Sequence, residues 1–310
     1  MASTALILGG SGRFGRAAAE AFWNAGWKVR IFDRKEDRLP EAATGADLIV
    51  NGWNPPYDRW SAELPGLTER VVEAARGSGA TILQAQNIYV YGKGSPEVLS
   101  VRTAHAATNP LGRLRIDMEE TLRSSGVQVI VLRAGDFIDT TGSGNWLDRI
   151  ILAKLSKSRL VYPGDPEIPH AWAYLPDLAR GAVDLAAKRE ELDQFEDVPF
   201  PGYTLTGRAL ACLVAQASGQ EVRPNRMSWL LLRLASPVWP MARGLLEMRY
   251  LWDMPHSIDP AHFDALLPDF AGTPPAEALA TAVRGLNGPQ VARPNDASRA
   301  GGMVSSATSP

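Results

Sequence analysis

The fold is decided by Leu8-Gly9-Gly10-Ser11-Gly12-Arg13-Phe14-Gly15, in which glycines recur every third residue at positions 9, 12 and 15. The run Ala5-Leu6-Ile7-Leu8 that leads into it is typical of a short strand buried on both faces. After the turn, apolar residues recur at helical spacing from Phe14 to Ala25, and Gly26 ends the pattern. A strand, a glycine turn and a helix in this order predict a dinucleotide-binding site.

Each glycine of this turn has a physical task. One permits the tight turn, one lets the backbone approach a pyrophosphate, and one lets the helix pack against the strand. The helix that begins near Arg13 directs its free N–H groups and its positive dipole end at the phosphates. The residues predicted to hold the pyrophosphate are Gly9, Ser11, Gly12, Arg13, Phe14 and Gly15.

The rest of the N-terminal half alternates between strands and helices. Further strands are expected at residues 29–32, 47–50, 81–83 and 127–132, with helices over residues 67–75 and 111–122. This alternation predicts an α/β fold, a Rossmann-type doubly wound parallel sheet with helices on both faces.

Beyond about residue 140 the alternation fades, which indicates a second, smaller region. The predicted organisation is a dinucleotide-binding domain over residues 1–165, completed by 170–190, and a mostly helical substrate-capping region over 191–285. Pro237 and Pro240 are expected to break or kink the apolar helix predicted over residues 227–246. Residues 286–310 are rich in Gly, Pro, Ser and Asn, which predicts a disordered tail.

Composition restricts the partners. The chain has 310 residues and a formal net charge of −2, which gives no long-range attraction to nucleic acid or anionic lipid. Cys212 is the only cysteine, so an internal disulfide is excluded and a reducing, cytoplasmic location is expected. The four histidines show no metal-ligand spacing, so no metal is expected. The expected partner is a small molecule rather than nucleic acid or a membrane, and a homodimer stays open.

The residues after the second and third strands bear on the choice of cofactor. Asp33 is placed to accept hydrogen bonds from the adenosine ribose, which favours NAD and repels the 2′-phosphate of NADP. Arg34 and Arg13 favour the opposite choice, because a guanidinium can grip that phosphate. Asn51 and Trp53, after the third strand, could border the cofactor at the same sheet edge. The prediction is NAD, with NADP as the alternative.

Residues 4–190 resemble the extended and atypical short-chain dehydrogenase/reductases, the group of NAD-dependent epimerases and dehydratases. The resemblance rests on four stretches, namely the glycine turn, Asn87-Ile88-Tyr89-Val90-Tyr91-Gly92, Leu132-Arg133-Ala134-Gly135-Asp136-Phe137, and residues 170–179. It implies a Rossmann domain, a nicotinamide cofactor and hydride transfer on a hydroxyl or carbonyl substrate, such as a sugar derivative.

The sequence departs from this family at the catalytic residues. Family enzymes use a Ser together with a Tyr and a Lys four residues apart, and these positions fall on Asn87, Leu111 and Arg115. Asn87 can bind a substrate oxygen and Arg115 can hold a ribose hydroxyl, but Leu111 cannot carry a proton. The resemblance therefore leaves the proton carrier open.

Tyr91 is the first candidate for that carrier, followed by Tyr89, Asp136 and His170. The predicted function is an NAD(P)-dependent oxidoreductase or epimerase/dehydratase. The alternative is a non-catalytic NAD(P)-binding sensor that kept the cofactor site after losing the Tyr-Lys pair.

Overall fold

A computed structural model gives the fold and describes residues 2–287. Its centre is a six-stranded sheet with the strand order β10-β6-β4-β3-β1-β2, in which every neighbouring pair is parallel. The strands are β1 (Thr4–Leu8), β2 (Lys28–Ile31), β3 (Leu48–Asn51), β4 (Thr81–Asn87), β6 (Val129–Ala134) and β10 (Phe195–Pro199). The predicted doubly wound parallel sheet is confirmed.

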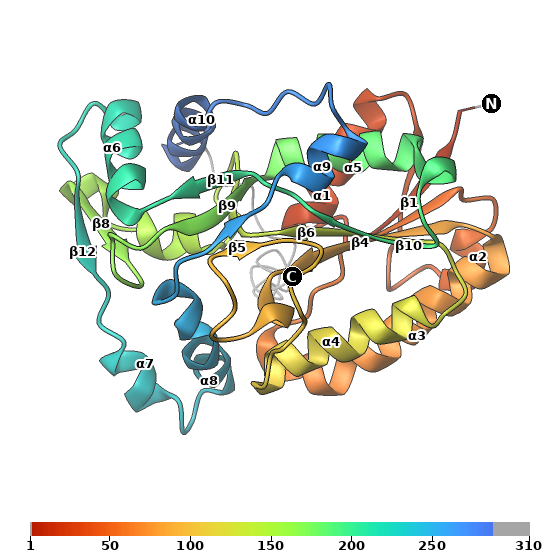
Figure 1. The fold of residues 1–310 in the computed structure, drawn as a ribbon, viewed down its shortest axis with the longest axis horizontal. Helices are drawn as coiled ribbons and strands as arrows, with labels where there is room; N and C mark the ends of the chain where they lie inside the picture. Colours follow the sequence, from red (N-terminus) through yellow and green to blue (C-terminus); the bar gives the residue numbers. More distant parts are fainter. Residues whose placement is uncertain (1, 288–310) are drawn as a thin grey trace, which may run out of the picture.

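Helices cover both faces of this sheet, as Figure 1 shows. One layer contains α1 (Arg13–Asn24), α5 (Leu175–Ala187) and α9 (Ala261–Leu266), and the other contains α2 (Leu39–Ala43), α3 (Trp60–Ser78) and α4 (Pro110–Arg123). Because side chains alternate along a strand, Ala5 and Ile7 of β1 pack under the first layer, whereas Leu6 and Leu8 pack under the second. An uninterrupted apolar run is therefore required here.

Most of the remaining elements form a separate apolar cluster at one end of the sheet (Figure 1), whereas Leu99 and Ile258 belong to another cluster. The helices among these elements are α6 (Gly207–Ser218), α7 (Leu230–Ala235), α8 (Pro240–Glu247) and α10 (Pro275–Asn287). The strands are β5 (Val98–Leu99), β7 (Asp136–Ile138), β8 (Arg159–Tyr162), β9 (His170–Tyr174), β11 (Tyr203–Leu205), β12 (Arg223–Arg226) and β13 (Ser257–Ile258).

Short helical turns connect these elements. The 3₁₀ turns are η1 (Tyr57–Arg59), η2 (Tyr89–Tyr91), η4 (Leu155–Lys157), η5 (Arg189–Glu191) and η6 (Met248–Trp252), and η3 (Leu147–Ile151) is a π-helical turn. The apolar stretch 227–246 is divided into α7 and α8 around Pro237 and Pro240, as proline chemistry predicts.

Two of the expected boundaries differ in the structure. Strand β10 lies inside the range assigned to the capping region, yet it pairs along its whole length with β6 and forms an edge of the large sheet. Its sequence Phe-Glu-Asp-Val-Pro does not predict a buried strand, because it contains two carboxylates. In the structure these carboxylates are held by partners from other elements. The predicted tail, 286–310, lies outside the described residues from 288 onward, while Leu286 and Asn287 are the last residues of α10.

Candidate functional site

The glycine turn joins β1 to α1 in a closed loop. Gly9 has a φ of +75°, which favours glycine, and its carbonyl oxygen accepts a hydrogen bond of 2.8 Å from Gly12 N–H. A Cβ on Gly15 would lie 2.1 Å from the same oxygen, so helix and turn can meet only at a glycine. A Cβ on Gly12 would meet that oxygen at 3.1 Å and nothing else nearby. The backbone geometry of the turn thus requires glycine at positions 9 and 15, whereas Gly12 leaves the surface of the turn accessible to a ligand.

The N-terminus of α1 has the character of an anion site. The first backbone hydrogen bond of the helix runs from Arg16 N–H to Gly12, so the N–H groups of Arg13, Phe14 and Gly15 have no acceptor within the helix. Gly12 as N-cap has no side chain to cap them, and no acidic residue lies in the first turn. An anionic ligand would satisfy these N–H groups. Ser11 lies exposed beside them, whereas the Phe14 ring is buried in the core.

Two of the candidate cofactor residues are occupied by structural contacts. The Arg13 guanidinium donates to the carbonyl oxygens of Ser143 and Gly144, at 3.2 and 2.5 Å. Asn51 donates through Nδ2 to Gln84 and accepts at Oδ1 from Trp53 N–H. Asn51 therefore fixes the loop after β3, and Arg13 ties the turn to residues 143–144.

Trp53, Asp33 and Arg34 lie at one sheet edge. The Trp53 ring is buried against Phe32 and Gly9, and the Arg34 guanidinium lies 4.6 Å from its centroid. Trp53 Nε1 is buried and finds no hydrogen-bond acceptor among residues 2–287. Asp33 is exposed just beyond β2, and its Oδ1 accepts from Lys35 N–H. These three predicted residues are brought together beside the glycine turn.

Arg115 occupies the inner part of the site. It projects from α4 and donates from Nη1 to Gln86 Oε1 at 3.0 Å and from Nη2 to Asn54 Oδ1 at 2.7 Å. The guanidinium lies 4.0 Å from the Trp60 ring centroid, and Nε is buried with no acceptor in the described part of the chain. Burial lowers the pKa of Arg115 to about 10, so the group stays cationic at neutral pH.

Two tyrosines beside Arg115 form a hydroxyl pair that the sequence did not reveal. The hydroxyl oxygens of Tyr57, in η1, and Tyr89, in η2, lie 2.6 Å apart. Burial raises the pKa of both, and the positive charge of Arg115 acts in the opposite direction on both. The hydrogen bond couples the two hydroxyls, because the hydroxyl that donates favours ionisation of the one that accepts. Asp136 opposes that ionisation and helps to keep the pair protonated.

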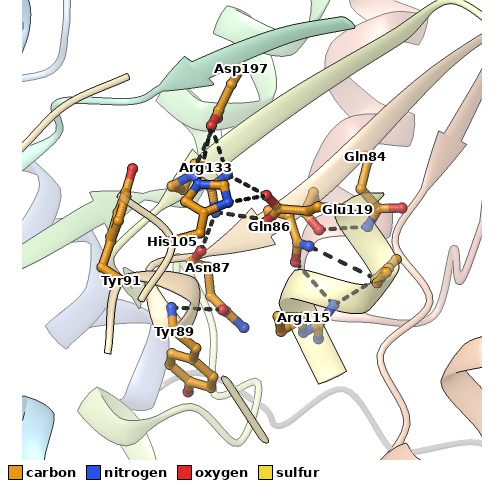
Figure 2. Close-up of polar contacts among 12 residues, drawn as sticks. Gln84, Gln86, Asn87, Tyr89, Tyr91, His105, Arg115, Glu119, Arg133 and Asp197 are labelled. Carbon is orange, nitrogen blue, oxygen red and sulfur yellow. Dashed lines mark hydrogen bonds and ion pairs between the residues drawn. The ribbon is translucent and has the colours of Figure 1, made fainter. Parts of the chain in front are cut away.

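Tyr91, the first candidate proton carrier, does not join this pair. Residues two apart in a 3₁₀ turn point in different directions, and Figure 2 shows Tyr91 and Tyr89 on separate sides of η2. The Tyr91 hydroxyl is 3.5 Å from the Ser100 carbonyl oxygen and its ring packs against His105. Burial raises the pKa of Tyr91 to about 12. Its surroundings are those of a core tyrosine, and a role of Tyr91 as proton carrier stays a prediction.

Asn87 lies at the end of β4 between the two tyrosine environments. Its Oδ1 accepts from Tyr89 N–H, and its backbone carbonyl accepts from Arg133 (Figure 2). Nδ2 is therefore the group of Asn87 that can donate a hydrogen bond to a substrate oxygen.

Behind this site Arg133 is the centre of a buried charge cluster. It forms a two-pronged pair with Glu119 at 2.9 Å and a second pair with Asp197, while His105 lies against both carboxylates (Figure 2). His105, Glu119 and Asp197 present ligand atoms within 4.8 Å of one another. The guanidinium pairs with both carboxylates and offsets one of their two negative charges, so a buried cation is already present in this cluster. An open cavity of about 460 Å³ adjoins it, on the side of Arg102, Arg123 and His262.

The two remaining candidates, Asp136 and His170, form a pair of their own. His170 Nε2 lies 2.8 Å from Asp136 Oδ2, and the imidazole stacks on Trp252 with a centroid distance of 4.2 Å. His256 packs edge-on against the same imidazole. The His170 pair therefore connects β7 and β9 to η6 at the border of the C-terminal region.

Comparisons with known proteins agree with this fold. MoeE5, in complex with UDP-glucose and NAD, superposes with a TM-score of 0.70 at 18% identity, covering 91% of this chain and 98% of its own. UDP-glucuronic acid 4-epimerase from Bacillus cereus, in complex with UDP-glucuronic acid and NAD, gives 0.70 at 13% identity, covering 92% and 99%. WbmH from Bordetella bronchiseptica, in complex with NAD⁺, gives 0.69 at 17% identity, covering 92% and 98%.

The chain therefore shares the fold of these three solved structures. No protein-family model and no curated protein matched the sequence. Among residues 2–287, no helix combines the length and the apolar character needed to cross a bilayer.

Proposed function

We propose that this protein is an NAD-dependent enzyme that transfers hydride between the cofactor and a carbon bearing a hydroxyl or carbonyl group. The observation that carries the proposal is the Tyr57–Tyr89 hydroxyl pair beside Arg115, at the sheet edge that carries the glycine turn. A pair of proton-bearing groups next to a fixed cation supplies the acid–base function that Leu111 cannot.

The residues present fit a nicotinamide dinucleotide. The open N–H groups of α1 suit a pyrophosphate, and Trp53 Nε1 and Arg115 Nε are buried donors with no acceptor among residues 2–287. Arg13 and Arg34 are engaged with the 143–144 loop and with the Trp53 ring, whereas Asp33 keeps an exposed carboxylate. This arrangement supports NAD over NADP.

When bound, NAD would supply the hydride acceptor or donor, and the protein would bind the reactants, orient them and transfer the proton. Arg115 would hold a ribose hydroxyl and favour the ionised form of the tyrosine pair. The tyrosine pair would pass a proton to or from the reacting oxygen, with Tyr57 and Tyr89 exchanging it through their hydrogen bond. Asn87 would fix that oxygen through Nδ2. The raised pKa values of the tyrosines keep both hydroxyls protonated at neutral pH, which is the state that reduction of a carbonyl requires.

The proposed substrate class is a nucleotide sugar or a related small carbonyl compound. MoeE5 and the Bacillus cereus epimerase were crystallised with UDP-sugars, and this chain covers nearly the whole length of each. The substrate would lie between the sheet edge and a capping region formed by residues 200–285. Residues 1–165 and 170–199, which include β10, would form the dinucleotide-binding domain.

The test compares three Tyr→Phe variants. The full-length protein is given NADH or NAD with UDP-glucose, UDP-glucuronic acid and a panel of aldehydes and ketones, and cofactor absorbance is followed. Tyr57→Phe should lower kcat by about 10²- to 10⁴-fold, the range for loss of a general acid. Tyr91→Phe, the matched control, should stay within about twofold because its hydroxyl faces the core. Full activity in both Tyr57→Phe and Tyr89→Phe would refute the proton-carrier assignment.

One observation favours a second candidate function, a non-catalytic dinucleotide sensor. The position that carries the family's proton-donating Tyr is Leu111, buried and with its backbone N–H engaged by Glu247. A sensor would bind NAD measurably in titration calorimetry yet turn over no member of the panel.

A further inference from the structure

An exposed apolar surface lies on and just after α7, far from the glycine turn. We call it the apolar tip, and it consists of Leu230, Leu231, Leu234, Val238 and Trp239, whose exposed fractions are 59, 75, 68, 87 and 47%. Five large apolar side chains exposed within ten residues form the kind of patch that marks an interaction site. In Figure 1, α7 lies at the outer margin of the molecule, and α8 connects it to the body.

The charges around the apolar tip have a single sign. Between Arg226 and Leu246 the chain contains three arginines and no acidic residue. Arg226 pairs with Asp165, but Arg233 and Arg243 are exposed and form no ion pair with any residue from 2 to 287. The tip is therefore apolar and locally cationic on a chain of net charge −2. This pattern complements an anionic surface.

We propose that the apolar tip docks on an anionic lipid bilayer as a peripheral contact. Leu231, Leu234 and Val238 would enter the headgroup boundary, Trp239 would lie at the interface, and Arg233 and Arg243 would bind lipid phosphates. A second copy of the chain is a poorer occupant, because a symmetric contact would bring like charges together. The tip is too short to span a bilayer, so this contact changes the expectation that membranes are not partners without requiring a membrane-spanning helix.

The docked helices connect directly to the candidate site. A Cβ on Gly244 of α8 would lie 2.7 Å from Tyr57 Cβ, so α8 packs closely on the turn that carries Tyr57. Glu247, at the end of α8, accepts hydrogen bonds from Asn109 and Leu111 of the α4 N-terminus. A bilayer contact at the tip would hold these elements at the lipid surface, with the site next to it.

The experiment is co-sedimentation of the full chain with vesicles of phosphatidylcholine alone or mixed with phosphatidylglycerol. Wild type should bind the anionic vesicles at least about tenfold more strongly than the neutral ones, with loss of binding at high salt. Leu231→Glu/Leu234→Glu should weaken binding at least about tenfold. Trp23→Glu is the matched control, because Trp23 is 69% exposed on α1 and lies outside the tip, and it should leave binding unchanged. Circular dichroism confirms that each variant is folded.

Three results would overturn the proposal. The first is failure of folded wild type to bind anionic vesicles at low salt, which would leave an acidic protein as the occupant. The second is equal binding by Leu231→Glu/Leu234→Glu. The third is light scattering that shows a wild-type dimer converted to a monomer by the same variant. None of these readouts involves NAD or turnover, so the proposal stands or fails separately from the proposed enzyme activity.

Discussion

Glu247 Oε1 lies 2.6 Å from the backbone nitrogen of Leu111, which joins the end of α8 to the first turn of α4 across 136 residues of sequence. Asn109, the N-cap of α4, makes no side-chain cap of its own and donates to the same carboxylate oxygen. Glu247 therefore caps the N-terminus of α4, which its own N-cap residue does not cap. The negative charge of Glu247 also interacts favourably with the positive end of the α4 dipole.

Replacing this distant cap should destabilise the protein. Glu247→Ala is expected to lower the free energy of unfolding by about 1–2 kcal/mol, because it removes a charge-assisted cap. Glu247→Gln, which retains an acceptor oxygen, should cost less. Urea unfolding followed by circular dichroism measures both, with Glu120→Ala on the exposed face of α4 as control. Equal midpoints for Glu247→Ala and wild type would contradict the assignment.

Removing the Arg133 guanidinium should have a larger effect. Arg133→Met leaves Glu119 and Asp197 as close, uncompensated carboxylates, and losing one partner of a buried pair costs about 3–5 kcal/mol. The triple change Arg133→Met/Glu119→Leu/Asp197→Leu should recover much of this loss, because no buried charge then lacks a partner. The same urea titrations apply, and a triple variant less stable than Arg133→Met would argue against this explanation.

Two glycines of the turn should respond differently to substitution. Gly12→Ala should keep the fold and weaken NAD binding at least about tenfold, since its methyl group narrows the approach to the open N–H groups of α1. Gly15→Ala should destabilise the fold, because its Cβ would overlap the Gly9 carbonyl. Titration calorimetry and thermal melting separate the two effects. Gly66→Ala, which meets no atom within 4 Å, is the control.

Cofactor choice should depend on Asp33. Asp33→Ser removes the negative charge that repels a 2′-phosphate and leaves Arg34 beside it, so affinity for NADP should rise relative to NAD by about tenfold or more. Calorimetry with both dinucleotides measures the ratio, and Glu36→Gln on the same exposed loop should leave it unchanged. Tighter binding of NADP by the wild type would show that Arg34 outweighs Asp33.

Stability should fall on mild acidification because of His256. Burial and the neighbouring His170 lower the pKa of His256 to about 3, whereas an unfolded histidine titrates near pH 6.5. The unfolded state therefore binds more protons between these values, so stability from this group is complete above about pH 6.5 and declines as the pH falls through that window. The slope is about 1.4 kcal/mol per pH unit, and His256→Gln should flatten the curve of unfolding free energy against pH.

The sequence predicted what depends on local pattern. The glycine turn, the buried strands and the helices around them follow from residues within one strand-turn-helix unit, so the fold could be read directly. The grouping of Asp33, Arg34 and Trp53 also followed, because parallel strands bring their carboxyl ends to one edge.

The proton-bearing pair could not be predicted in the same way. Tyr57 and Tyr89 are 32 residues apart and meet only because two 3₁₀ turns face each other. The directions in which Tyr89 and Tyr91 point depend on the geometry of η2, which sequence spacing alone does not give. The sequence does contain a signal, because Tyr57 follows β3 at the ligand edge, in the same loop as Trp53.

The pairing of β10 with β6 has a consequence for dissecting the chain. A fragment that ends at residue 190, the predicted end of the dinucleotide-binding domain, would lack β10. The edge of Val129–Ala134 that pairs with β10 would then expose unpaired backbone N–H and C=O groups on an apolar strand. Such a truncation should self-associate, whereas one that continues through Pro199 keeps β10 as the edge strand, whose two carboxylates and proline disfavour pairing with another chain.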